Sequence, residues 1–182
     1  MKRKILLLLS FLGGSFLSAE TRILIPAEAK VEMGITNDGV MGGLSKGKVT
    51  KTEEGTYLFS GDLSLENNGG FSSLRMNGGD WNLDGWRGIE IEVKGDGRTY
   101  DLRVTTDETY RDSSVSFSGK FETKKDEWTK VRVPFSSLKA SWRGRELDRE
   151  FDPAKIESLG ITIADKVQGP FKLEFRTFVA WK

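Results

Sequence analysis

The side chains of this chain that could do chemistry are carboxylates, arginines, lysines and aromatic rings, because its 182 residues include no histidine and no cysteine. These two absences exclude a thiolate nucleophile, a cysteine-ligated zinc ion and a Ser-His-Asp triad. Asp38 and Asp96 could hold a hard cation through oxygen ligands, but an aspartate in a turn more commonly caps its own backbone. The spacing of the acidic residues identifies no catalytic carboxylate pair. We therefore expect no metal site, no cofactor and no enzymatic activity.

The two aspartates belong to a set of three glycine-rich turns. These turns read Asn-Asp-Gly-Val-Met-Gly-Gly-Leu-Ser at residues 37–45, Asn-Gly-Gly-Phe-Ser-Ser-Leu-Arg at 68–75 and Gly-Asp-Gly-Arg at 95–98. Glycine in such turns predicts backbone with positive φ or backbone that passes close to other atoms. We expect the three turns to meet in one cluster, which either binds a partner or only closes the fold. Its candidate members are Asn37, Asp38, Gly39, Met41, Gly42, Gly43, Ser45, Gly70, Phe71, Arg75, Asp96, Gly97 and Arg98.

The environment of Arg75 depends on which side chains of its strand point inward. If Leu74 points inward, Arg75 is an ordinary surface residue. If Ser73 points inward instead, Arg75 is buried and needs a carboxylate partner. The paired glycines before this strand can bulge it, so both orientations remain open. For the buried case we expect Asp38 or Asp96 to pair with Arg75.

From residue 20 onward the chain shows the alternation of apolar and polar residues that is typical of β-strands. The two most regular runs, Ile89–Val93 and Tyr100–Val104, flank a Gly-Asp-Gly turn and predict an antiparallel hairpin. The one helical signal is Asp152 followed by Pro153, an N-cap and first-turn pair that predicts at most two turns. About nine or ten short strands at turn-marked spacing predict an all-β fold, a β-sandwich or jelly roll in a single domain over residues 20–182.

The N-terminal residues 1–19 have the pattern of a cleaved signal peptide. Residues 2–4 are basic, residues 5–12 are apolar, and small Ala19 precedes the expected cut. The apolar run is too short for a comfortable transmembrane span, so we expect no membrane anchor after cleavage. This pattern predicts a periplasmic or extracellular location. The remaining chain is nearly neutral and offers no electrostatic basis for binding nucleic acid.

Four motifs in one order resemble the complex I intermediate-associated protein 30 family. They are N-D-G-V-M-G-G-x-S at residues 37–45, G-G-F-x-S-x-R at 69–75, G-D-G-R-x-Y at 95–100 and W-x-x-V-x-V-P-F at 128–135. The family's tryptophan ahead of the first motif is replaced here by Met33. The resemblance implies a galactose-binding-like β-sandwich without a known catalytic activity. It also implies a protein partner, because mitochondrial members assist complex I assembly as chaperone-like partners of membrane-arm intermediates.

Two classes of function follow from these observations. The first is a non-catalytic protein-binding module for assembly of a respiratory or envelope complex, with Met41 or Leu44 contacting the partner. The second is a carbohydrate-binding module of the cell envelope, in which Trp81 and Trp86 would form a platform for sugar rings. The same tryptophans could instead close the core of the sandwich. An exposed apolar patch at the rim of the loops would favour the first class, and stacked tryptophans on a concave face the second.

Overall fold

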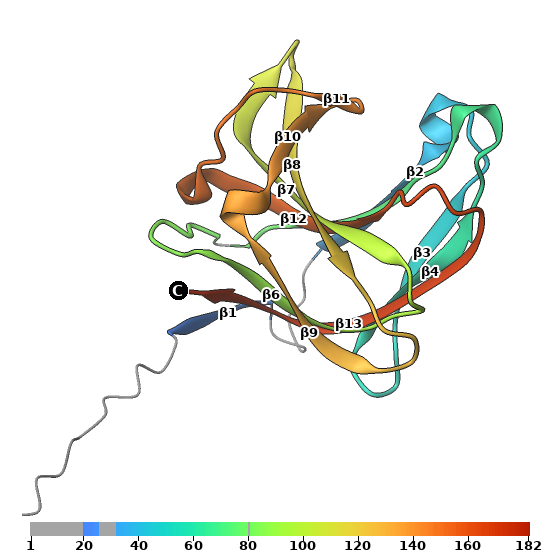
Figure 1. Ribbon diagram of the computed structural model, residues 1–182, viewed down its shortest axis with the longest axis horizontal. Helices are drawn as coiled ribbons and strands as arrows, with labels where there is room; N and C mark the ends of the chain where they lie inside the picture. Colours follow the sequence, from blue (N-terminus) through green and yellow to red (C-terminus); the bar gives the residue numbers. More distant parts are fainter. Residues whose placement is uncertain (1–19, 26–31, 80) are drawn as a thin grey trace, which may run out of the picture.

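The computed structural model describes residues 20–25, 32–79 and 81–182, which form two antiparallel β-sheets packed face to face (Figure 1). This architecture confirms the expected all-β sandwich. The predicted signal peptide, residues 1–19, lies outside the described residues.

Sheet A contains six strands. In order they are β3 (Lys46–Lys51), β4 (Tyr57–Leu63), β13 (Gly169–Trp181), β6 (Gly88–Lys94) and β9 (Trp128–Pro134), with β1 (Thr21–Ile25) also paired to β13.

Sheet B contains seven strands. In order they are β11 (Arg145–Glu146), β10 (Lys139–Trp142), β8 (Ser113–Glu122), β7 (Thr99–Tyr110), β12 (Ile156–Ile163), β5 (Ser72–Asn77) and β2 (Glu32–Asn37). Four short 3₁₀ turns complete the described elements: η1 (Asp38–Met41), η2 (Glu66–Asn68), η3 (Phe135–Ser137) and η4 (Pro153–Lys155). In η4 the Asp152 side chain accepts a hydrogen bond from the Ala154 amide, so the predicted helix start is confirmed but lasts a single turn.

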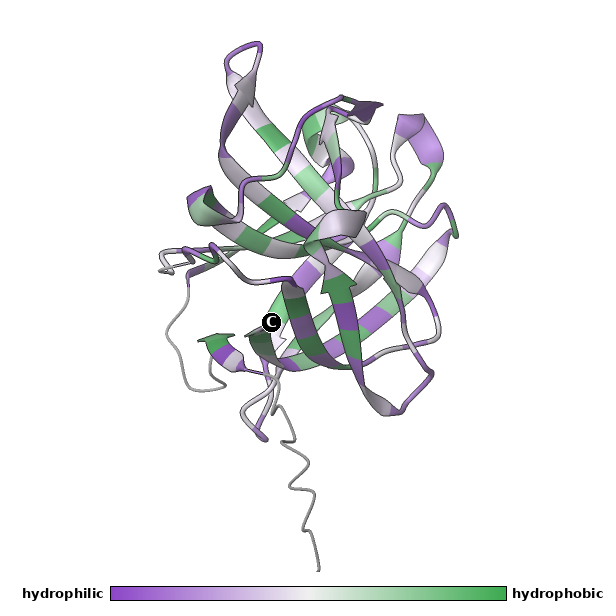
Figure 2. Cartoon of the chain, turned by 60° about the vertical axis from the view of Figure 1, so that its left-hand side comes forward, coloured by the Kyte–Doolittle hydropathy of each residue, from purple (hydrophilic) through white to green (hydrophobic). Residues whose placement is uncertain are grey.

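The core lies between the sheets and is lined by alternate residues of each strand, a pattern visible as colour bands along the strands in Figure 2. On β6 the inward side chains include Ile89 and Ile91, and on β7 they include Tyr100 and Leu102, all fully buried. The outward positions of both strands are polar, as expected for sheets with one wet face.

The predicted hairpin between β6 and β7 is wrong. β6 pairs with β13 and β9 in sheet A, while β7 pairs with β8 and β12 in sheet B. The segment 95–98 therefore crosses from one sheet to the other. Alternation shows which side chains face the core, and two strands that line the same core from opposite sheets have the same alternation as two strands of one sheet.

Four strands were not anticipated from the sequence: β1, β2, β10 and β11. β2 and β11 are the edges of sheet B, and β10 lies next to β11. Such strands bury few side chains and carry little apolar alternation. Met33 and Ile35 of β2 are nevertheless half-buried and pack against the main core, so Met33 serves as a core residue.

The connections β2–β3, β4–β5, β6–β7 and β12–β13 lie at one end of the sandwich, which we call the loop end. The strand register places Asn37 of β2 opposite Ser72 of β5, and Leu63 of β4 opposite Gly169 of β13. Ser72 also lies opposite Ile163, the last residue of β12. All three glycine-rich turns are therefore at the loop end.

Candidate functional site

The buried carboxylate of Asp38 joins the β2–β3 loop to the β4–β5 loop. Its Oδ1 accepts a hydrogen bond from the Ser45 amide at 2.9 Å, and its Oδ2 accepts one from the Ser45 hydroxyl at 2.5 Å. Oδ2 also accepts bonds from the amides of Gly70 at 2.6 Å and Phe71 at 3.2 Å. The Ser45 hydroxyl in turn accepts a bond from the Ser64 amide at 3.0 Å. One carboxylate thus satisfies the polar groups of two loops.

These hydrogen bonds control the ionisation of Asp38. Burial opposes the charged form and would raise its pKa, but the bonds from Ser45, Gly70 and Phe71 favour the carboxylate and hold the pKa below its usual value. Asp38 is therefore a charged structural anchor, and its lone pairs are occupied by the loop itself. No group of three residues suited to holding a metal ion occurs in the part of the chain that the structure describes.

Two glycines at this site, Gly43 of the first motif and Gly69 of the second, are explained by this carboxylate. A Cβ added at Gly43 would lie 2.4 Å from the carboxyl carbon of Asp38, and one added at Gly69 would lie 2.7 Å from its Oδ2. Gly42 has φ +92°, the left-handed conformation that ends η1. Gly39, in contrast, has nothing within 4 Å of the Cβ position. Gly42, Gly43 and Gly69 are therefore required by geometry, and Gly39 is not.

Asn37 fixes the neighbouring strands in a similar way. Its Oδ1 accepts hydrogen bonds from the Gly47 amide at 3.0 Å and from the Ser72 hydroxyl at 2.7 Å. It thereby links β3 of sheet A to β5 of sheet B. The polar residues of the first motif hold the loop end together.

The apolar residues of the same motif point to solvent. The exposed fractions are 75% for Val40, 63% for Met41 and 51% for Leu44, and Leu65 of the adjacent β4–β5 loop is 41% exposed. We call these four residues the apolar rim. The two loops that carry it are tied by a hydrogen bond from Asn67 Nδ2 to the carbonyl of Gly42 at 3.3 Å.

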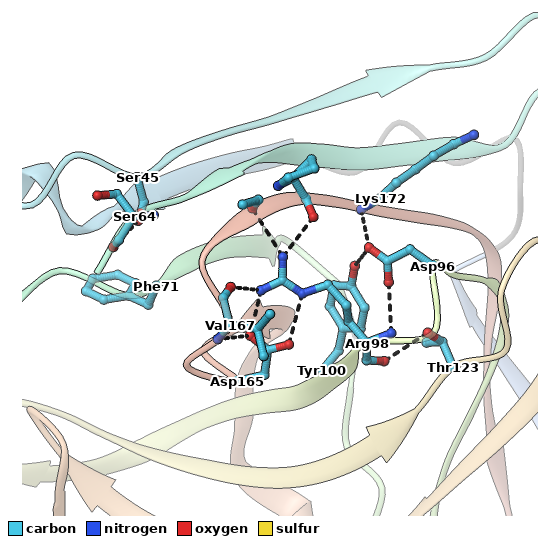
Figure 3. Close-up of polar contacts among 12 residues, drawn as sticks. Ser45, Ser64, Phe71, Asp96, Arg98, Tyr100, Thr123, Asp165, Val167 and Lys172 are labelled. Atoms are coloured by element: carbon cyan, nitrogen blue, oxygen red, sulfur yellow. Dashed lines mark hydrogen bonds and ion pairs between the residues drawn. The ribbon is translucent and has the colours of Figure 1, made fainter. Parts of the chain in front are cut away.

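A second polar cluster at the loop end is built around Arg98 (Figure 3). Its guanidinium forms a bidentate pair with Asp165, with Nε–Oδ2 at 2.9 Å and Nη2–Oδ1 at 2.6 Å. It also donates to the carbonyls of Gly169 at 3.2 Å and Pro170 at 2.8 Å, and to that of Val167. Arg98 thus fastens the β6–β7 crossing to the β12–β13 loop.

Arg98 and Asp165 stabilise each other's charged forms. The hydrogen bonds with Asp165 raise the pKa of Arg98. Burial of Asp165 opposes its ionisation, but the hydrogen bonds from Arg98 outweigh this and lower the pKa of Asp165. The side chains of Arg98 and Asp165 are 12% and 10% exposed, so water screens this pair little.

Asp96 lies beside this pair but bonds to other groups. Its carboxylate accepts hydrogen bonds from the Arg98 amide at 3.0 Å, the Tyr100 hydroxyl at 3.1 Å and the Lys172 amide at 2.7 Å. Burial, together with the charge of Asp96, raises the pKa of Tyr100. The Thr123 hydroxyl accepts a bond from the Gly97 amide at 3.2 Å and completes the turn.

The predicted residues therefore form two clusters, and the expected pairing of Arg75 is wrong. One cluster contains Asn37, Asp38, Gly43, Ser45, Gly70 and Phe71, and the other contains Asp96, Gly97 and Arg98. Leu74 points inward, so Arg75 is exposed on the outer face of sheet B, and Asp38 and Asp96 have the other partners described above.

The sequence alone did not assign roles to Asp165, Thr123, Ser64 or Ser72. Asp165 is 67 residues from Arg98, and only the sheet topology brings the two together. Its position directly after a buried strand, at the loop end, was the available signal.

The proposed tryptophan platform is not formed by Trp81. This residue is 2% exposed and belongs to the core, while Trp86 is half-buried against that core with Lys182 Nζ 4.9 Å above its ring. Among the described residues there is no helix with the length and apolarity needed to cross a membrane.

The fold and the loop end define the class of protein: a galactose-binding-like β-sandwich whose end loops are fixed by buried polar clusters. Residues 26–175 match the family model described as complex I intermediate-associated protein 30, and the chain belongs to this family. The four motifs recognised in the sequence lie within the matched residues.

Curated relatives carry the same family name. A probable complex I intermediate-associated protein 30, mitochondrial, of Caenorhabditis briggsae is 29% identical over 154 residues, covering 72% of this chain and 44% of that protein. The complex I intermediate-associated protein 30, mitochondrial, of Mus musculus is 34% identical over 90 residues, covering 47% of this chain and 27% of that protein. The chain thus spans less than half the length of these relatives.

Among solved structures, the chain resembles the family 11 carbohydrate-binding module of a cellulosomal cellulase of Clostridium thermocellum. The TM-score is 0.67, the identity 14%, and the match covers 90% of this chain and 95% of the module. At this identity the likeness shows the fold alone.

The predicted periplasmic or extracellular location is contradicted by these relatives, which are named as mitochondrial proteins. The prediction rested on a short basic and apolar N-terminal segment. Such a targeting segment is recognised by a receptor through its own sequence, and the fold of the sandwich does not determine that sequence.

Proposed function

We propose that this chain is a non-catalytic protein-binding module that assists assembly of respiratory complex I, and that it contacts its partner through the apolar rim. Membership of the complex I intermediate-associated protein 30 family supports the assembly role. Because the chain spans only part of its curated relatives, the role concerns the shared domain.

The observation that carries the proposal is where exposed apolar side chains gather. Six large hydrophobic residues are exposed in the described part of the chain, and five of them are in loops at the loop end. These five are the apolar rim and Val167, which is 55% exposed in the β12–β13 loop. Exposed apolar clusters bordered by polar groups are typical of protein–protein contact sites. Met41 suits such a site because its thioether adapts to irregular shapes.

The polar clusters beneath the rim support the same role. Asp38 and Asn37 fix the backbone of the β2–β3 loop before any partner arrives, so little conformational entropy is lost when the rim is covered. Glycine loses much conformational entropy on folding. In this proposal the glycines of the motif allow the loop conformation that holds the apolar side chains exposed.

Carbohydrate binding has weaker support, because it rests on the fold of neighbours that share little sequence with this chain. Sugar-binding sites stack rings on aromatic side chains. On the outer face of β5, β12 and residues 99–105 of β7, the outward residues are serine, threonine, asparagine, aspartate, arginine and glycine. These residues offer no aromatic ring on which a sugar could stack.

The test is capture of complex I intermediates from detergent-solubilised respiratory membranes by the immobilised chain. We expect Met41→Ser to abolish capture and to leave the melting temperature nearly unchanged, because the side chain is exposed. Ile23→Ser is the matched control, since Ile23 is 62% exposed on β1, at the opposite end of the sandwich. Undiminished capture by a well-folded Met41→Ser protein would remove the rim from the site. A glycan array run with the same protein tests the carbohydrate alternative directly.

A further inference from the structure

The outer face of sheet B carries two arginines that lie on either side of one glycine. Gly160 of β12 is opposite Arg75 of β5 on one side and opposite Arg103 of β7 on the other. The three residues form a row across the middle of the sheet. A Cβ added at Gly160 would lie 2.2 Å from the carbonyl oxygen of Leu74, so a glycine is required where β5 and β12 approach closely between the two arginines.

A small hollow occupies this position. It has a volume of about 10 Å³ and is lined by residues of β5, β7 and β12, including both arginines and Gly160. This volume accommodates roughly one water-sized group. The hollow opens outward, so a group that enters it can belong to a larger ligand outside.

Pairs of hydroxyl groups border the row on both sides. Ser73 and Thr162 are 2.7 Å apart, and Thr105 and Ser158 are 2.6 Å apart. All four are buried even though they are on the outward side of their strands. Three of them, Ser73, Thr105 and Ser158, line the hollow and give it polar walls.

Neither arginine of the row has a carboxylate partner. Among the described residues, Arg103 donates from Nε and Nη2 to the Ser116 hydroxyl, at 3.0 and 2.7 Å, and neither Arg103 nor Arg75 forms an ion pair. Asp101, two residues before Arg103 on β7, acts on it electrostatically without pairing. Burial and the positive charge of Arg75 lower the pKa of Arg103, and the charge of Asp101 offsets this effect only in part.

The outer face of sheet A shows the contrary arrangement. There Arg132 pairs with Glu90 at 2.7 Å, and Arg176 pairs with Glu92. Outward arginines of this protein therefore have carboxylate partners on one sheet and lack them at the Arg75–Gly160–Arg103 row.

We propose that Arg75 and Arg103 bind a carboxylate group of an acidic side chain on a protein partner. Guanidinium groups donate charge-assisted hydrogen bonds to carboxylates. The hollow has room for a single carboxylate oxygen, and Nη1 of Arg103 remains available beside Arg75 because the Ser116 hydroxyl binds only Nε and Nη2. This site is on a sheet face and is separate from the apolar rim, so it goes beyond the function proposed above.

The experiment is an NMR titration of the ¹⁵N-labelled chain with N-acetylglutamate amide as the carboxylate probe. We expect saturable shifts of the Arg103 Nε–Hε and Gly160 amide signals at millimolar probe, and none with the neutral isostere N-acetylglutamine amide. Arg75→Gln should weaken binding by about tenfold or more, the loss of one charge-assisted pair. Arg75 is exposed, so this variant is expected to fold, and an unchanged amide spectrum away from the site checks it.

Arg132→Gln is the matched control, because it removes the same charge from the other sheet. Equal weakening by Arg132→Gln would show that binding follows net charge and would overturn the site. Absence of shifts with the glutamate probe would also overturn it. Inorganic phosphate is the comparison ligand, and saturation by phosphate at lower concentration than by the glutamate probe would overturn the assignment to a carboxylate.

Discussion

The Asp38 carboxylate and the Ser45 hydroxyl lie 2.5 Å apart in the interior of the loop end. Between them they accept hydrogen bonds from four backbone amides, that of Ser45 in the β2–β3 loop and those of Ser64, Gly70 and Phe71 in the β4–β5 loop. Hydrogen bonds to a buried charge are stronger than neutral ones, and an unsatisfied partner is costly. The pair therefore determines the stability of the region that carries the apolar rim.

Replacing Asp38 by Asn tests this role. The amide group would put a donor where an oxygen now accepts, and at least one backbone amide would lose its partner. We expect the free energy of unfolding in urea to fall by about 2–4 kcal/mol. Asp62→Asn is the control, because Asp62 is an exposed residue of β4, and a change within about 0.5 kcal/mol is expected. Equal effects of the two substitutions would contradict the assignment.

Gly43 and Gly39 belong to the same motif, but only Gly43 is required by the packing around it, so substitutions at the two positions should differ in effect. Gly43→Ala would place a Cβ 2.4 Å from the Asp38 carboxyl carbon, while Gly39→Ala meets nothing within 4 Å. We expect thermal unfolding to show a loss of about 1–3 kcal/mol for Gly43→Ala and a change within about 0.5 kcal/mol for Gly39→Ala. A Gly43→Ala protein as stable as the parent would rule out the tight packing described here.

The pair formed by Arg98 and Asp165 is expected to stabilise the fold strongly. Arg98→Ala leaves a mostly buried carboxylate without its partner, which costs about 3–5 kcal/mol in comparable cases. Arg87→Ala is the control, since Arg87 is exposed. A double-mutant cycle with Asp165→Ala measures the interaction itself, and a coupling energy near zero would mean that the two side chains act independently.

Stability should fall in acid for a specific reason. The pKa values of Asp38 and Asp165 are lowered in the folded state from 3.8 in the unfolded chain. Both groups therefore stabilise the protein fully above the unfolded value, and this contribution is lost as the pH falls through the folded pKa. Urea unfolding followed from pH 6 to pH 2 should show the loss below about pH 4, and Asp38→Asn should make it shallower.

Asp101 should act with the opposite sign. Burial raises its pKa above 3.8, so its contribution is greatest at low pH and is lost as the pH rises through the folded value. We expect Asp101→Asn to increase stability at neutral pH relative to the parent and to remove this part of the pH dependence. A less stable Asp101→Asn protein at pH 7 would show that its carboxylate has a favourable partner.

Features of the fold and the site that depend on residues close together in the sequence could be predicted, and those that depend on distant residues could not. Alternation within β6 and β7 identified the inward residues correctly, because it reflects burial of a single strand. It did not show which strands pair, so the hairpin was wrong. The motif residues of the loop end were found, since glycine and Asx turns are local features. The pairing of Arg98 with Asp165 depends on the order of strands across two sheets and leaves no local pattern.

The orientation of Arg75 illustrates the same limit. Arg75 points inward or outward depending on which alternate residues of β5 face the core. The paired glycines ahead of β5 can bulge the strand, so the sequence does not show which residue begins this alternation. The row that Arg75 forms with Gly160 and Arg103 arises from the register of three strands, which are distant in the sequence.

The central position of β13 in sheet A has a consequence for how the protein is made. This strand pairs with β4, β6 and β1, so Thr21 contacts Trp181, and neither β4 nor β6 has its inner neighbour until the end of β13 is available. Contacts between such distant residues give a high contact order, and domains of this kind fold slowly. The inner edges of β4 and β6 therefore stay unpaired until β13 has been synthesised, and sheet A closes only after β13 has left the ribosome.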